Sequence, residues 1–123
     1  MGLRFNPSLR TMFIGEAAKQ TGLTIKAIRF YEAKGLIPSP SRQGRYRVYN
    51  QDHLDLLILI KEAKGLGIPL SRLEGVIEIT QGQINWPVIA QFLAQAKNEI
   101  LQEIAHLQFK VTQIDQCIEQ IHG

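Results

Sequence analysis

The chain has 123 residues, of which 45% are hydrophobic and 20% are charged. This length supports one domain and is too short for two sizeable ones. The sequence has no apolar run of the roughly eighteen residues that a membrane-spanning helix needs. Its single cysteine, Cys117, excludes an internal disulfide and fits a reducing cytoplasm.

The positive charge lies in the front part of the chain. Residues 1–70 hold eleven Lys/Arg against five Asp/Glu, a net charge of +6, whereas residues 71–123 hold three against six, a net charge of −3. A basic front and an acidic rear indicate a polyanionic partner for the front part alone. A basic face that is merely solvated would give the same totals, so charge alone leaves both interpretations open.

We divide the chain into a tail (1–12), a head (13–80), a linker (81–86) and a C-terminal helix (87–123). The tail is basic but has no apolar segment, so it does not have the pattern of a secretory signal peptide. It is either a basic arm or the result of the choice of start site.

The head begins with the pattern of a helix-turn-helix. A short helix is predicted over 14–20, and a second helix over 24–34 with Thr24 as its N-cap. Ala18 is small where the second helix crosses, Gly22 provides a permissive backbone for the tight turn, and Ile28 fills the angle between the helices. Such a triple also occurs by chance, so it is only one part of the argument.

A small wing is predicted next. Pro38 and Pro40 prevent the second helix from continuing. The segment 41–49 holds three arginines among two tyrosines and has the pattern of two short strands that turn at Gln43-Gly44.

Two more helices complete the predicted head. Asn50 is a plausible N-cap for a helix that stops around 65–67, and a further helix is predicted over 70–79. His53, in the first turn of the third helix, is interpreted as a solvated surface residue.

The C-terminal helix carries the clearest periodicity in the chain. Its apolar residues alternate spacings of four and three, which is the heptad pattern of a coiled coil. From residue 87 to residue 122 the helix would be about 54 Å long, too long to fold back within so small a chain. The pattern therefore predicts pairing with a second copy, although packing along the chain's own head remains an alternative. The predicted dimer interface consists of Leu93, Ile100, Ile104, Leu107, Val111, Ile114, Ile118 and Ile121.

The order of these parts resembles the MerR family of bacterial transcription regulators. The most specific motif is Ile28-Arg29-Phe30-Tyr31-Glu32, followed by Gly35-Leu36-Ile37. The resemblance also rests on Ile14-Gly15-Glu16-Ala17-Ala18, Thr21-Gly22-Leu23-Thr24, Arg42, Tyr46-Arg47, Tyr49 and Leu66-Gly67-Ile68-Pro69-Leu70. It covers about residues 13–79, with the coiled-coil helix following where the family has its dimerisation helix.

The resemblance implies a mainly α protein, with a winged helix-turn-helix head and a long C-terminal coiled-coil dimerisation helix. It further implies a homodimer, joined by an antiparallel coiled coil, that binds an inverted-repeat promoter site and distorts the spacer DNA. RNA polymerase at the promoter is then an expected partner, and we expect no membrane partner, cofactor, metal site or enzymatic activity.

The predicted DNA contacts come from the second helix and the wing. Lys26 and Arg29 are three residues apart on one helix face, so both can enter a single major groove, where arginine is well suited to guanine. A phosphate contact without sequence information is the alternative for each. Phe30 is assigned to packing, and Tyr31 to packing with its hydroxyl reaching a phosphate. The candidates are Thr24, Lys26, Arg29, Tyr31, Arg42, Arg45, Tyr46, Arg47 and Tyr49.

The sequence departs from the family pattern at two places. Arg45 follows Gly44 directly, so we expect a wing loop one residue shorter than is usual in the family. No effector region follows the dimerisation helix. Cys117 is interpreted as a small coiled-coil residue, because one thiol with His106 or His122 falls short of the three or four ligands of a tight metal site.

An architectural DNA-bending protein of the excisionase type is the alternative function. Such heads do not need a heptad pattern of this length, so the promoter regulator is favoured. No paired carboxylates, glycine-rich phosphate loop or nucleophile signature indicates catalysis. The signal sensed, the target genes and the direction of regulation are left open.

Overall fold

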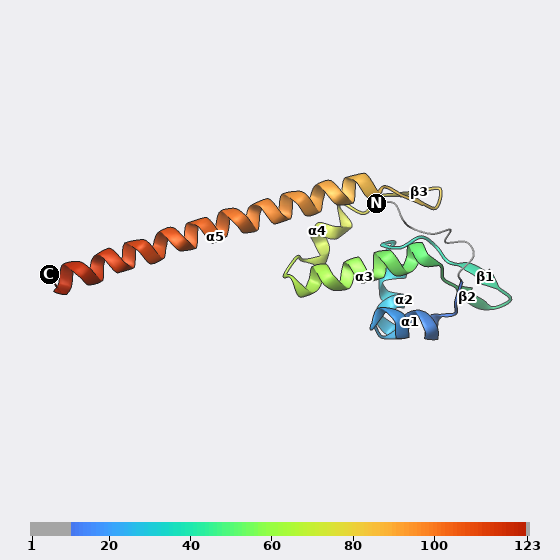
Figure 1. The fold of residues 1–123 in the computed structure, drawn as a ribbon. Helices are drawn as coiled ribbons and strands as arrows, with labels where there is room; N and C mark the ends of the chain where they lie inside the picture. The colour runs from blue at the N-terminus through green and yellow to red at the C-terminus, as the bar shows by residue number, and fades with distance from the viewer. Residues whose placement is uncertain (1–10, 123) are drawn as a thin grey trace. The chain divides into compact units, whose positions relative to one another are not determined.

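The computed structural model describes residues 11–122, and most of the tail lies outside them. The protein is mainly α, as predicted. It forms two compact units, a head that ends at Asn85 and a helical unit that begins at Trp86. Figure 1 shows the helices and strands of each unit.

The helix-turn-helix is confirmed at residue level. Helix α1 (Ile14–Thr21) ends at Gly22, whose φ of 76° lies in the left-handed region that favours glycine. Helix α2 (Ile25–Ala33) begins after Thr24, whose hydroxyl accepts a hydrogen bond from the amide of Ala27 at 3.0 Å. Thr24 is therefore the N-cap that the sequence predicted.

Helix α3 (Gln51–Gly65) supplies much of the core of the head. Its predicted N-cap is confirmed, because Asn50 and His53 form a reciprocal capping box. Lys61 of α3 donates to the carbonyl of Thr21 at 3.1 Å, satisfying an acceptor at the end of α1. Side chains from α1, α2, the wing and α3 meet in a core whose fully buried members include Ala17, Ile28, Tyr49, Leu56, Leu57 and Ile60.

The wing is a two-stranded antiparallel sheet of β1 (Ser41–Gln43) and β2 (Tyr46–Val48), with Gln43 opposite Tyr46. The turn is therefore Gly44-Arg45, and the predicted turn at Gln43-Gly44 is wrong by one residue. Gly44 has a φ of 66°, as the first central position of a two-residue type II′ turn requires.

One residue assigned to the tail takes part in the head. Met12 pairs with Tyr49 through two backbone hydrogen bonds of 2.9 and 2.7 Å, just beyond the end of β2. The chain is thus fixed against the wing before α1 begins.

The segment after α3 differs from the prediction. Helix α4 (Leu70–Glu74) stops at Gly75, five residues before the predicted end, since glycine is a poor helix former and β-branched residues follow. The segment expected to be a linker contains most of a hairpin of β3 (Ile79–Thr80) and β4 (Gln83–Ile84). Gln81 and Gly82 both have positive φ, the pattern of a type I′ hairpin turn.

The second unit is one uninterrupted helix, α5 (Trp86–His122), as Figure 1 shows. The predicted interface residues from Ile100 to Ile121 are between 45% and 81% exposed, while Leu93 is half-buried. Within residues 11–122, no helix is both long and apolar enough to cross a membrane.

Candidate nucleic-acid interface

Helix α2 presents a basic, solvent-exposed face. Thr24, Lys26 and Arg29 are all exposed. Phe30, predicted to pack in the core, is also 48% exposed, so that assignment is wrong. Its ring lies 5.6 Å from the ring of Tyr31 and 5.7 Å from the ammonium nitrogen of Lys34, which is a position suited to a cation–π contact.

Tyr31 lies on the buried side of the same helix. Its side chain is only 4% exposed, and its hydroxyl is 3.5 Å from the ammonium of Lys64 in α3. The packing role predicted for Tyr31 agrees with this burial. Its hydroxyl contacts Lys64 of α3, and the phosphate contact expected for this hydroxyl stays a prediction.

The wing carries three arginines with different partners. Arg42 donates to the carbonyl of Arg45 at 3.3 Å, bracing the hairpin, while the side chain of Arg45 is exposed. Arg47 is bound to Glu32 of α2. Tyr46 is 60% exposed, and its ring lies 5.7 Å from the ring of Phe13, the residue before α1.

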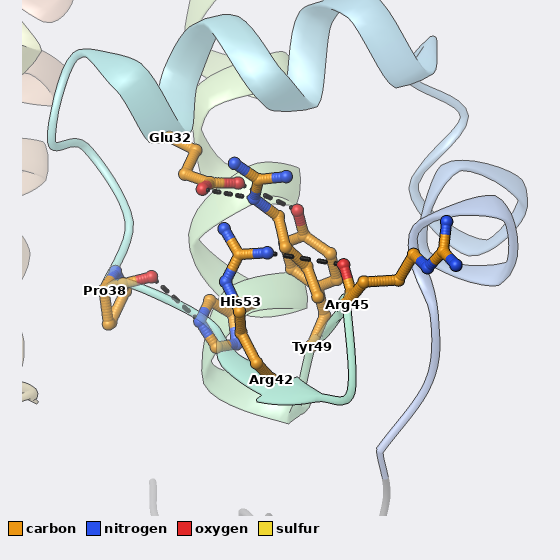
Figure 2. Close-up of polar contacts among 7 residues, drawn as sticks. Glu32, Pro38, Arg42, Arg45, Tyr49 and His53 are labelled. Carbon is orange, nitrogen blue, oxygen red and sulfur yellow. Dashed lines mark hydrogen bonds and ion pairs between the residues drawn. The ribbon is translucent and has the colours of Figure 1, made fainter.

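Glu32, in the last turn of α2, connects the recognition helix to the wing. One carboxylate oxygen accepts from Nε of Arg47 at 2.7 Å, and the other accepts from the hydroxyl of Tyr49 at 2.9 Å. Figure 2 shows Glu32 on α2 with dashed lines running from its carboxylate to these partners, of which Tyr49 is labelled. Burial, and next the hydrogen bond to Glu32, raise the pKa of Tyr49, and Glu32 also raises the pKa of Arg47. Both groups therefore keep the protons that they donate.

A second contact fixes the loop between α2 and the wing. Nδ1 of His53 accepts from the amide of Asn50 at 2.9 Å, so Nε2 carries the proton and donates to the carbonyl of Pro38 at 2.9 Å. His53 also packs edge-on against Tyr49 at 5.3 Å. The residue is only 4% exposed, so its interpretation as a surface residue is wrong. Burial lowers its pKa, which favours the neutral ring that these two bonds require.

Four of the predicted contact residues line one hollow between α2 and the wing. Arg29, Arg45, Tyr46 and Arg47 surround a space of about 90 Å³. The other five candidates are not in its lining. Tyr31 and Tyr49 are buried, Thr24 and Lys26 lie at the start of α2, and Arg42 lies on β1.

The sequence did not identify Glu32, Phe13 or the carbonyl of Pro38 as partners of the residues in this interface. Glu32 lies inside the motif Ile28-Arg29-Phe30-Tyr31-Glu32, and its charge was the available signal. A partly buried carboxylate on a helix that packs against a basic wing needs a cationic partner. The side chain of Glu32 is 17% exposed. No local signal could have paired Phe13 with Tyr46, because the two are far apart in the sequence.

Comparisons with known proteins agree with this geometry. Residues 12–79 match the family model described as "MerR HTH family regulatory protein". The chain belongs to the MerR family. It is 34% identical over 111 residues to the HTH-type transcriptional regulator CueR of Salmonella typhi, covering 89% of this chain and 76% of that protein.

Solved structures of MerR-family proteins have the same fold. The crystal structure of HiNmlR, described as a MerR family regulator lacking the sensor domain and bound to promoter DNA, aligns with a TM-score of 0.56 and 25% identity. The alignment covers 83% of this chain and 79% of HiNmlR. A MerR-family regulator from Bacillus cereus aligns with a TM-score of 0.52 and 26% identity, over 87% of this chain and 79% of that one.

Membership of the MerR family makes this protein a transcriptional regulator with a helix-turn-helix DNA-binding domain, and not an enzyme, as predicted. It favours the promoter regulator over the excisionase-type alternative. The wing, the helix-turn-helix and the long helix are the parts that the family resemblance implied.

Proposed function

We propose that this MerR-family regulator binds an inverted-repeat promoter site as a homodimer and distorts the DNA between its two half-sites. The observation that carries the proposal is the alignment of two basic surfaces by Glu32. The exposed face of α2 and the exposed arginines of the wing belong to elements joined by bonds of 2.7 and 2.9 Å. A recognition helix and a wing held in this way can bind a groove of the DNA and the sugar-phosphate backbone beside it at the same time.

Within this interface, α2 lies in the major groove and the wing follows the neighbouring backbone. Lys26 is placed to meet a base edge or a phosphate, because it is exposed in the first turn of α2. Arg42, Arg45 and Tyr46 of the wing meet sugar and phosphate groups, while Tyr31 and Tyr49 act from below by supporting α2 and the wing.

A second copy of the chain is the proposed partner of α5. The interface residues from Ile100 to Ile121 share one stripe and are exposed, and burying such a stripe against its equal removes apolar surface from water. Two heads on one coiled coil account for an inverted repeat, since the protein's two-fold symmetry is then matched by the DNA. RNA polymerase, recruited to the realigned promoter, completes the proposed set of partners.

Selection of bound sequences from a random duplex pool tests this function directly. We expect an enriched inverted repeat, and binding that weakens steeply with salt. With about six to ten phosphates contacted per dimer, affinity should fall roughly 10³- to 10⁵-fold between 50 and 200 mM salt. Lys110→Ala removes a positive charge from α5 and serves as the control, which should leave the salt dependence unchanged. A flat response to salt, or no enriched sequence, would contradict DNA binding, and a single unpaired half-site would contradict the dimer.

A further inference from the structure

The imidazole of His53 contacts both ends of the wing and the start of α3. Its Nε2 donates to the carbonyl of Pro38 at 2.9 Å, in the loop that leads from α2 to β1, and Figure 2 shows this bond as a dashed line. Its Nδ1 accepts from the amide of Asn50, the N-cap of α3, at 2.9 Å. The ring also packs edge-on against Tyr49, the residue after β2, with 5.3 Å between the ring centres. One side chain therefore supports three segments that meet at the base of the wing.

Only the neutral ring of His53 can make both hydrogen bonds. With one proton, on Nε2, the ring donates to Pro38 and accepts from Asn50. A second proton, taken from the solvent, binds to Nδ1 and then faces the amide proton of Asn50. The reciprocal capping box of α3 thereby loses one of its two bonds, and an N–H group faces another N–H group. Because His53 is only 4% exposed, water cannot readily stabilise the charged ring in its place.

The surroundings of the ring set the pH at which the second proton binds. Burial lowers the pKa of His53 by more than the bond to Pro38 and the negative charge of Glu32 on α2 raise it. The charge of Glu32 is offset in part, because its carboxylate is bound to a guanidinium of the wing. Further ionisable groups on the elements around the ring are Asp52 in the first turn of α3, Arg42 on β1, Arg47 on β2 and Tyr49. The ring is therefore neutral at neutral pH and becomes charged in acid.

Protonation of His53 acts on the alignment of the wing with α2. Pro38 lies before β1 and Tyr49 directly after β2, so a displaced ring disturbs both ends of the hairpin. The hydroxyl of Tyr49 donates to Glu32 at 2.9 Å, and Glu32 is the carboxylate that joins α2 to the wing. The alignment that carries the proposed DNA binding therefore depends on a ring that has a single proton.

We infer that His53 is a proton switch for DNA binding: the neutral ring holds the wing in the position that binds DNA, and the doubly protonated ring releases it. The inference rests on the proposed DNA-binding function and adds a regulation of it. Proton binding at His53 and DNA binding then oppose each other, so each weakens the other by the same factor. Acidification is thus a signal that the head senses through one of its own residues.

Titration of the three histidines by NMR, with and without the selected duplex, tests the opposition directly. If the DNA complex requires the neutral ring, the bound duplex should lower the pKa of His53. Simple electrostatics predicts the reverse, because the negative phosphates of a bound duplex raise the pKa of a histidine. His106 and His122, both exposed on α5, are internal controls whose pKa should stay the same or rise. A pKa of His53 that DNA leaves unchanged or raises, or a ring that takes no second proton before the protein unfolds, would overturn the inference.

The variant His53→Gln separates the proton switch from general effects of acid. Glutamine is a usual residue at this position of a capping box, and its side-chain oxygen can accept from the amide of Asn50 without titrating. Wild-type affinity for the selected duplex should fall by up to about tenfold per head for each pH unit below the folded pKa of His53. His53→Gln should bind like the wild type at about pH 7.5 and lose much less affinity towards about pH 5. His106→Gln is the matched control and should keep the pH dependence of the wild type.

The outcomes separate this inference from the proposed function. If the wild type binds no specific DNA at neutral pH, the proposed function fails first. If it binds a specific site and its pH profile coincides with that of His53→Gln, the function stands and the proton switch is wrong. The switch is also wrong if affinity is lost only at pH values where circular dichroism shows an unfolded protein. If His53→Gln does not fold, the NMR titration of the wild type still decides the question.

Discussion

Replacing Val111 and Ile114 by Asp tests whether α5 forms the dimer. The two side chains are 57% and 59% exposed in the single chain, so more than half of each is available for burial against a partner. Full burial of such a side chain contributes about 1.5–3 kcal/mol, so the exposed portion contributes about 1 kcal/mol or more. Four side chains are lost per dimer, two from each copy, which amounts to roughly 4 kcal/mol.

A loss of about 4 kcal/mol corresponds to a roughly thousandfold weaker dimer, and the desolvation of four carboxylates weakens it further. Sedimentation velocity should therefore show a dimeric wild type and a monomeric Val111→Asp/Ile114→Asp variant at micromolar concentration. DNA binding should weaken with it, because two linked heads gain from effective concentration.

The control places the same charges away from the apolar stripe. Gln113→Asp/Gln116→Asp adds two carboxylates per chain at exposed positions of α5 that are not predicted interface residues. This variant should remain dimeric. A monomeric wild type, or equal dissociation of the two double variants, would refute the heptad interface.

Three further predictions concern single residues. His53→Gln should remove a pH-dependent part of the stability. Burial lowers the pKa of His53 in the folded state, so the wild type loses stability as pH falls below about 6.5, by at most about 1.4 kcal/mol per pH unit. Urea unfolding between pH 7.5 and 5.5 measures this loss, and a variant with the same pH profile as the wild type would contradict the prediction. Thr24→Ala should cost about 1 kcal/mol in the free energy of unfolding by removing the cap on Ala27, whereas Thr24→Asn should retain it; equal losses would show that the cap is unimportant. Cys117→Ser should keep dimerisation and DNA binding, because an exposed thiol supplies only one metal ligand per chain. A metal titration that alters DNA binding by the wild type but not by this variant would instead indicate a metal-sensing role.

Much of the architecture follows from local chemistry in the sequence. Thr24 and Asn50 are N-caps because their short polar side chains can accept backbone amide bonds, which requires only residues within three positions. The heptad pattern of α5 is likewise local, since its period fixes which side chains share a face. The helix-turn-helix, the wing and the long helix could therefore be predicted, and their order indicated the family.

Contacts between distant segments were decided by the tertiary structure. Glu32 and Arg47 are fifteen residues apart, and nothing in their immediate neighbourhoods specifies that one carboxylate holds both Arg47 and Tyr49. His53 looks polar and solvated in the sequence, yet the fold brings the carbonyl of Pro38 to its ring and covers it. Phe30 looks apolar and buried, yet the packing of α2 turns Tyr31 inward and leaves Phe30 at the surface. Residue type and period limit what a side chain can do, but burial and long-range pairing depend on which surfaces the packed elements leave uncovered, and only the folded chain determines that.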